Sequence, residues 1–377
     1  MAVTDLILSS FRRCSLPLVL FLYAAGIGMQ FPVSRRLMTR QLCMEVFSRD
    51  TCENLADYPK IQARVQGVSA SAQNLQGMLT DIPGALAMLV LGTLSDRIGR
   101  KRVLLVPCYG SLILAVVSIL QSLMTKVSIP LTVLGALVFG LSGGLQTLLM
   151  TIINIITDTT PEEKVVLTIG RTLPVMAFGS LCGGLSADIL PQFLGPTLVL
   201  VIFAISQILS IAIVKLFVEE SLPPVEADGS ESAAKDGGKG RGRIMTSLST
   251  VWTNLTEGFR VVKSQESSLA FRQLVIFLVA SMLSSASTSF ENTLVLFYTK
   301  LSPFGWSIPT YRVYTTAKMF FGIIGQSLGT PVFLGLLGKA SLRNDFRLLQ
   351  YGALFAAIAT MVTALAPSSL YLLFGKT

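Results

Sequence analysis

The chain has no histidine and little charge, since Asp, Glu, Lys and Arg together make up 14% of its 377 residues. Without imidazole, it cannot build histidine metal sites, Ser–His catalytic pairs or histidine proton relays. The five cysteines form no C-x-x-C pair, so we expect no zinc site and no cofactor. Soluble domains carry about 25% charged residues, so roughly half of the usual charge is missing. These deficits argue against a soluble metalloenzyme.

Long apolar runs take the place of the missing charge. Hydrophobic residues make up 51% of the chain, and its mean hydropathy is +0.66. Because a helix needs roughly 20 apolar residues to cross a bilayer, the sequence predicts an all-α polytopic membrane protein. We expect its spans at about 15–33, 73–94, 103–124, 128–152, 166–189, 196–218, 272–295, 312–337 and 348–366.

The runs divide into two groups around a polar stretch. Residues 1–218 hold six predicted spans and form an N-terminal six-helix half. Residues 219–271 are rich in Gly, Ser and Lys at their centre, a composition typical of a flexible linker, here expected in the cytoplasm. Residues 272–377 hold about three spans and the start of a fourth, so we expect an incomplete C-terminal half.

The formal net charge of +9 raises the question of nucleic-acid binding. The basic residues, however, lie in short loops between apolar runs and not along one helical face, which is typical of membrane orientation signals. Arg97 and residues 100–102 share one loop, whereas the next loop has only Lys126. We therefore expect a cytoplasmic N-terminus and no nucleic-acid partner. Cys43 and Cys52 share the first outer loop, where a disulfide and two free thiols are both compatible with the sequence.

The loop between the second and third predicted spans carries the sharpest motif. A loop this short needs a tight turn, and two glycines in it allow close backbone approach and unusual dihedral angles. An aspartate at the helix end is placed to accept backbone N–H groups. The stretch reads Gly92-Thr-Leu-Ser-Asp96-Arg97-Ile-Gly99-Arg100-Lys101-Arg102.

This stretch resembles the G-x-L-x-D-R-x-G-R-K/R loop of the major facilitator superfamily, which stands at the same place in that family. The stretches at 158–164 and 218–224 resemble the family's acidic loop after the fourth helix and the end of its first half. The resemblance implies a two-half helical bundle with a central cavity, and alternating access by rocking of the halves. It also implies that Asp96 and Arg100 hold an inward gate together with Asp158.

The sequence departs from the family pattern in length. Nine full spans are expected where the family has twelve, so a truncated chain or a non-transporting relative is one interpretation. The first half, with its cysteine-containing outer loop, faintly resembles the proton-coupled folate carriers, and fungal drug or nutrient carriers fit equally well. The fifth span carries three of the glycines of the family's antiporter signature, and we expect these to serve close helix packing.

Polar residues inside the spans are the candidates for solute binding or proton coupling. A charge in the hydrocarbon costs at least about 2.5–3.5 kcal/mol, so each one needs a reason. Asp81 is the leading candidate, because it lies 15 residues from Asp96, or about 22 Å along a helix. The competing interpretation is that Asp81 faces the outer vestibule or pairs with a neighbouring helix. The other candidates are Arg171, Gln30, Gln146, Glu291 and Lys318, for which snorkelling, solvation or interhelical hydrogen bonds are the competing uses.

The function expected from these features is secondary active transport of a small organic solute, coupled to protons or another gradient. Its partners are the solute and the lipid bilayer, in a plasma, vacuolar or lysosomal membrane. A transporter-like sensor or scaffold is the alternative from another class. The sequence shows no nucleophile–base pair and no phosphate-cradling loop, so we do not expect an enzyme.

Overall fold

The computed structural model describes residues 2–47, 51–52, 58–222 and 308–337, with isolated positions between 272 and 361. The chain divides into two compact units, residues 1–225 with 323–346 and residues 226–322 with 347–377. Most of the predicted linker lies outside the described residues, as do most of the predicted spans 272–295 and 348–366. The boundaries of the two halves therefore remain a prediction.

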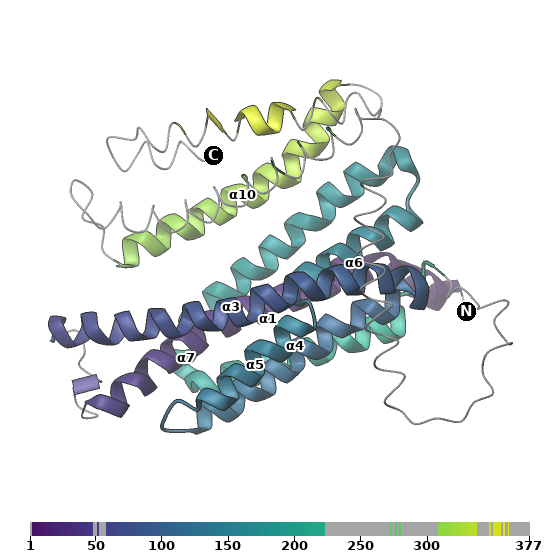
Figure 1. Cartoon of the computed structure of the whole chain (residues 1–377). Helices are drawn as coiled ribbons and strands as arrows, with labels where there is room; N and C mark the ends of the chain where they lie inside the picture. Colours follow the sequence, from purple (N-terminus) through teal and green to yellow (C-terminus); the bar gives the residue numbers. More distant parts are fainter. Residues whose placement is uncertain are drawn as a thin grey trace, which may run out of the picture. The chain divides into compact units, whose positions relative to one another are not determined.

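Helices account for nearly all of the described residues, and these residues contain no strand (Figure 1). The all-α prediction is confirmed. The helices are α1 (Ala2–Val46), α3 (Pro59–Ile98), α4 (Arg100–Leu123), α5 (Ile129–Leu141), α6 (Gly144–Thr159), α7 (Glu162–Phe217) and α10 (Ile308–Leu337).

Five apolar helical segments of the described chain are long enough to cross a membrane. The last of them, α7, has 56 residues, which is far longer than one crossing requires. Gly195 breaks its helical geometry with φ 77° and ψ 160°, between the predicted spans 166–189 and 196–218. Gly195 therefore divides α7 at the boundary between two predicted spans, and the six crossings expected in residues 1–218 stay a prediction.

The fourth predicted span, 128–152, differs from the structure in two ways. It is interrupted between α5 and α6 at Gly143 and Gly144, whose φ values of 76° and 50° fall in the left-handed region that glycine tolerates. It also continues to Thr159, so Asp158 belongs to the last turn of α6 and not to a following loop. The two helices still form one apolar segment, Ile129–Thr159.

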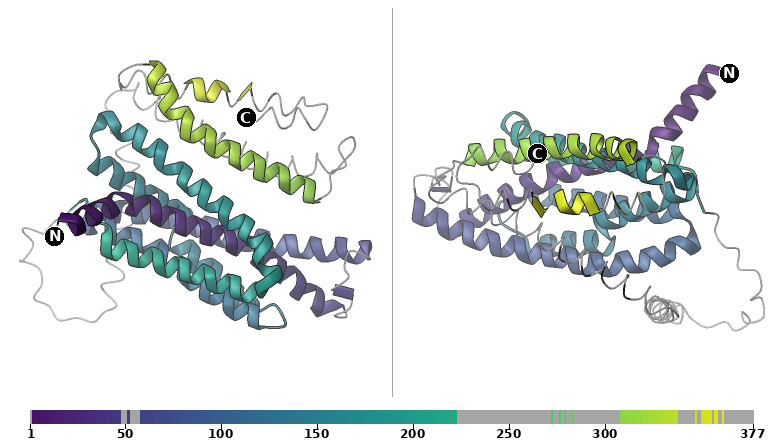
Figure 2. Two further views of the ribbon diagram at one scale, coloured as in Figure 1. Left: turned by 180° about the vertical axis from the view of Figure 1, so that it is seen from behind. Right: turned by 90° about the horizontal axis from the view of Figure 1, so that it is seen from above.

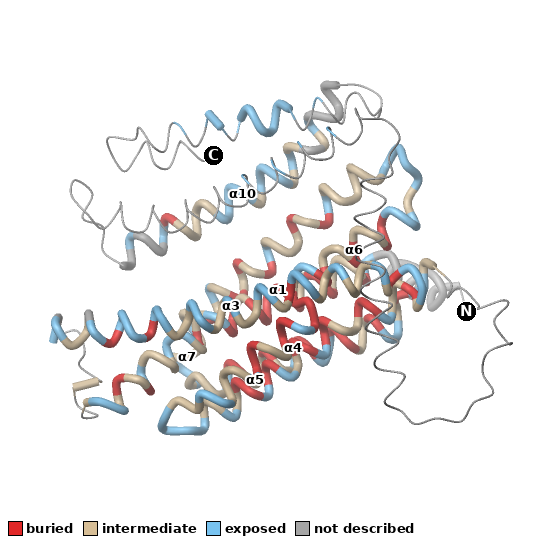
Figure 3. Tube along the Cα trace, viewed as in Figure 1, coloured by how far each residue is buried: buried red, intermediate tan, exposed pale blue. Residues whose placement is uncertain are grey.

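Helix α1 lies along α7, and α4 packs against α5, α6 and α7 (Figure 2). Buried positions gather along α4 and the helices beside it (Figure 3), where Tyr23 and Phe203 are fully buried. Gly179 of α7 makes the close contact to α1 possible, because a Cβ there would lie 2.6 Å from the carbonyl oxygen of Phe21. Gly183 packs on the α1 backbone in the same way, which confirms the packing role predicted for these two glycines.

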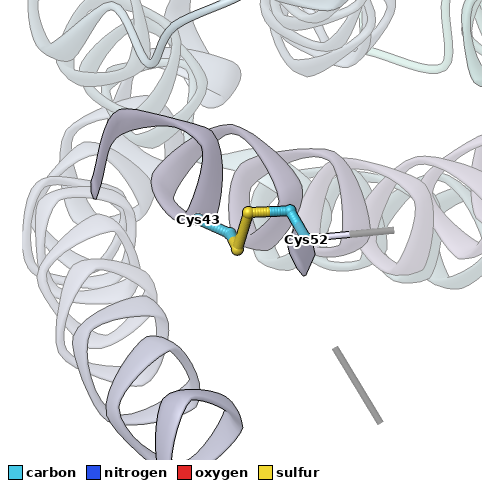
Figure 4. The surroundings of a disulfide bond; sticks show 2 residues. All are labelled: Cys43 and Cys52. Atoms are coloured by element: carbon cyan, nitrogen blue, oxygen red, sulfur yellow. A yellow bond between two sulfur atoms is a disulfide. The ribbon is translucent and has the colours of Figure 1, made fainter. Parts of the chain in front are cut away.

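A disulfide joins Cys43 at the end of α1 to Cys52 (Figure 4). The question that the sequence left open is thus answered in favour of the bonded pair. The bond stands at the opposite end of α3 from Gly99 and the basic loop. Because disulfides persist in oxidising compartments, this arrangement agrees with a basic loop that faces the cytoplasm.

Candidate functional site

The turn between α3 and α4 consists of a single residue, Gly99. Its φ of 100° lies where side chains are strained, so the glycine allows two long helices to reverse direction without a longer loop. Gly92 has a different role from the one predicted, because it lies within α3 and has no positive φ. A Cβ at Gly92 would lie 3.4 Å from the sulfur of Met150 on α6, which is an ordinary van der Waals distance, so the packing of α3 on α6 does not require a glycine there.

The guanidinium of Arg100 joins three side chains at this turn. Its Nε donates to Asp158 Oδ2 at 3.0 Å, and its Nη1 lies 2.7 Å from Asp96 Oδ1. Nη1 also donates to Ser95 Oγ at 3.0 Å. The Arg100 side chain is 11% exposed and that of Asp158 is 26% exposed, whereas Asp96 is 61% exposed. The sheltered pair with Asp158 therefore carries more energy than the solvated pair with Asp96.

The carboxylate at the N-terminus of α4 belongs to Glu220 and not to Asp96. The backbone N–H of Lys101 donates to Glu220 Oε1 and Oε2 at 3.2 and 3.3 Å. Asp96 lies in the last turn of α3, and its carboxylate pairs with the Arg100 side chain instead. An anion beside the unsatisfied N–H groups of a helix start is favourable, and Glu220 supplies it.

The same segment ties the end of α7 to the neighbouring ends of α4 and α6. Ser221 Oγ donates to Asp158 Oδ2 at 3.3 Å, and Lys101 Nζ donates to the carbonyl oxygen of Lys215 at 2.9 Å. We call the set Ser95, Asp96, Arg100, Lys101, Asp158, Glu220 and Ser221 the Gly99 cluster, after the turn beside it. It fastens the ends of α3, α4, α6 and α7 to one another. Arg97 is exposed in the last turn of α3.

Asp81 lies on an exposed face of α3. The backbone of its neighbour Thr80 packs against Gly140 of α5, so Asp81, about 100° further around the helix, points away from that contact. Met78 and Ile82 are each 62% exposed beside it. Among the described residues, no basic side chain pairs with this carboxylate.

The remaining candidate residues differ in their exposure. Gln146 and Arg171 are exposed on α6 and α7, whereas Gln30 is 1% exposed, inside the bundle. Lys318 lies on α10 and is partly buried, and Glu291 lies outside the described residues. Within the described ranges, no group of three or more acidic or cysteine side chains could hold a metal ion.

Sequence reasoning missed two parts of this arrangement. It gave Glu220 no role, because the cap joins residues 119 positions apart and no local signal links them. It also missed the ion pair between Arg36 of α1 and Asp188 of α7, which is reinforced by a hydrogen bond from Arg36 to the Ala187 carbonyl oxygen at 3.2 Å. Nothing in the local sequence links two residues on different helices.

Comparisons with known proteins bear on this helical architecture. A model of the Major Facilitator Superfamily matches residues 16–375. Among solved structures, the chain is similar to the human organic anion transporter MFSD10 (TETRAN), with a TM-score of 0.60 and 16% identity over 96% of this chain and 80% of that one. At this identity the likeness shows the fold. A search of curated proteins by sequence finds no match. Because the family model covers nearly the whole chain, this integral, multi-pass membrane protein belongs to the major facilitator superfamily of transporters.

Proposed function

We propose that the chain is a secondary active carrier that moves a small organic solute by alternating access, with proton coupling at Asp81. In this proposal the carrier moves the solute without changing it chemically and has no enzymatic activity. The observation that carries it is the exposed carboxylate of Asp81 within an apolar helix face.

The position of Asp81 makes a purely structural role expensive. About 22 Å of helix separate it from Asp96, which is well within a hydrocarbon core of about 30 Å. An ionised carboxylate that faced lipid there would cost about 2.5 kcal/mol or more. A water-filled path or a solute beside α3 removes this cost, and a carboxylate in such a path can take up and release a proton.

The Gly99 cluster supports the mechanical part of the proposed carrier cycle. Rocking of one half against another requires each half to move as a body, and the cluster fastens the ends of α3, α4, α6 and α7 through charge-assisted hydrogen bonds. Asp96, which is 61% exposed, leaves part of its carboxylate open toward a further partner. We propose that this open side serves the inward gate that the family resemblance implies.

Uptake into proteoliposomes tests the proposal. The purified chain is reconstituted and offered a panel of labelled small organic solutes under an inward proton gradient. The panel begins with organic anions, because MFSD10 is named an organic anion transporter and Arg171 is an exposed cation on α7. We expect saturable uptake that rises with the proton gradient.

Two variants separate coupling from general damage. Asp81→Asn should abolish the dependence of uptake on the proton gradient, whereas Glu163→Gln, the same chemical change at an exposed position in the first turn of α7, should leave it intact. Full gradient dependence in Asp81→Asn would exclude Asp81 as the coupling residue. No uptake of any solute would favour the alternative of a transporter-like sensor or scaffold.

A further inference from the structure

A small pocket opens inside the six-helix bundle, toward the end of α1 that carries the disulfide. Its volume is about 40 Å³. A single water molecule needs roughly 10–15 Å³ of such space. It is therefore large enough for a molecule of about three or four heavy atoms. Its walls come from α1, α3, α4 and α5, so the pocket belongs to the first unit alone.

One buried amide in this pocket has an unused acceptor. Gln30 is 1% exposed, and its Nε2 donates to Ser34 Oγ at 3.1 Å and to Ser118 Oγ at 3.3 Å. Its Oε1 has no hydrogen-bond partner among the described residues. A buried carbonyl oxygen without a donor costs about 1–3 kcal/mol, so a molecule that donates to it gains binding energy.

Four glutamines line the pocket, and two of the other three, Gln41 and Gln121, already use their side chains; the third is Gln76. Gln41 Nε2 donates to the carbonyl oxygens of Gln121 and Met124 at 2.9 and 2.7 Å, and the Gln121 side chain donates to Gln41 Oε1 at 2.8 Å. Gln121 Oε1 in turn accepts the Ser128 N–H at 3.3 Å. These bonds fix the shape of the pocket, while the buried Oε1 of Gln30 is left to bind.

The remaining lining selects the chemistry of the occupant. Leu37, Leu114 and Val117 form an apolar wall, and no Asp, Glu, Lys or Arg lines the pocket. Uncharged Gln, Ser and Thr side chains make up much of the rest of the lining, and a combination of apolar wall and fixed polar groups is typical of small-molecule sites. A charged molecule would lose its hydration here without gaining a counter-ion. A donor group at one end and a short hydrocarbon body at the other match the two sides of the pocket.

We propose that this pocket, which we call the Gln30 pocket, is a binding site for a small uncharged amide or alcohol, separate from the transport path. The donor of the ligand bonds to Gln30 Oε1, and its apolar end lies against Leu37 and Val117. Gln30 stands 16 residues after Cys14, where the first apolar segment begins, or about 24 Å along the helix. The site therefore lies in the outer part of the membrane, within reach of solutes on the side of the disulfide. It needs no movement between the halves, so its occupancy does not depend on whether the chain transports.

Acetamide and acetate provide a matched pair of probes, because they share size and shape and differ in charge. Saturation-transfer NMR with the full chain in nanodiscs detects weak binding of each. We expect a saturable signal from acetamide and none above background from acetate. Gln30→Leu should weaken acetamide binding by at least about tenfold, the loss of one buried hydrogen bond. Gln192→Leu, at an exposed glutamine of α7 outside the pocket, should leave it unchanged.

If Gln30→Leu fails to fold, Ser118→Ala provides the same test, because it removes a hydroxyl that orients the Gln30 amide. Equal signals from acetamide and acetate would overturn the proposal, and so would an acetamide affinity that neither pocket variant changes. The absence of any saturable acetamide signal would show that the pocket holds water only, and would also overturn it. Each of these results is independent of the uptake measurement.

Discussion

The bond between Arg100 and Asp158 should be worth measurably more than the bond between Arg100 and Asp96. A hydrogen bond to a charged group contributes about 1.5–3 kcal/mol when it is sheltered, and an exposed ion pair contributes about 0–1 kcal/mol. Arg100 and Asp158 are 11% and 26% exposed, so after allowance for solvent we expect a coupling energy of about 1–2 kcal/mol. Asp96 is 61% exposed, and for this pair we expect less than about 0.5 kcal/mol.

Double-mutant cycles measure these two couplings. Arg100→Met removes the guanidinium but keeps an apolar stem, and Asp158→Asn and Asp96→Asn each remove one negative charge at nearly constant shape. Cys108 provides the readout, because it is fully buried in α4 only two turns from Arg100. Its labelling by a thiol reagent requires local opening of the bundle, and a loss of 1–2 kcal/mol speeds labelling by about 5–30-fold. Cys14→Ala and Cys182→Ala remove the other free thiols.

Arg100→Met and Asp158→Asn should have less than additive effects on the free energy of local opening, because both break the same bond. Additive effects within about 0.3 kcal/mol would show that the two groups do not interact in the membrane. A coupling to Asp96 as large as that to Asp158 would show that exposure does not determine the strength of these bonds.

Further predictions concern the disulfide, the α4 cap and the α1–α7 contact. Mass spectrometry of the intact chain should show two additional maleimide adducts after reduction, because Cys43 and Cys52 are bonded before it. Glu220→Gln should speed Cys108 labelling by up to about fivefold, because it removes about 0.3–1 kcal/mol of helix-end stabilisation; an unchanged rate would contradict this. Gly183→Leu should lower the thermal midpoint of the bundle, because it overpacks the α1 contact at a cost of about 1–3 kcal/mol. Gly184→Leu is its control, since no described atom lies within 4 Å of the Cβ position there.

Much of this fold follows from the sequence because membrane spans are defined by composition over long windows. The predicted span at 103–124 and the helix Arg100–Leu123 nearly coincide, since charges and a glycine turn mark their inner limit. Helix α1 extends far beyond its predicted span, 15–33, because a helix continues into water where hydropathy no longer reports it. Only local backbone geometry separates α5 from α6 within one apolar run.

The site was partly predictable. Some of its residues belong to a local sequence motif, whereas others are brought to it by tertiary contacts. Gly99 and Arg100 were identified from the turn and its resemblance to a family motif. The cap by Glu220 depends on the end of α7 returning to the start of α4, a contact between residues 119 positions apart. The burial of Gln30 depends on the direction its helix faces, and a lone polar residue in an apolar run does not show that direction.

Entrance counterflow tests most directly whether the chain works by alternating access. Proteoliposomes are loaded with an unlabelled solute that the uptake panel has identified, diluted into a trace of the labelled form, and followed over time. A carrier with one alternating site should accumulate label transiently above its equilibrium level. Label enters by exchange, while the excess of unlabelled solute inside competes with it for exit. Asp81→Asn should retain this overshoot if its defect is confined to proton coupling. A monotonic approach to equilibrium, or entry no faster than into protein-free vesicles, would contradict the carrier mechanism.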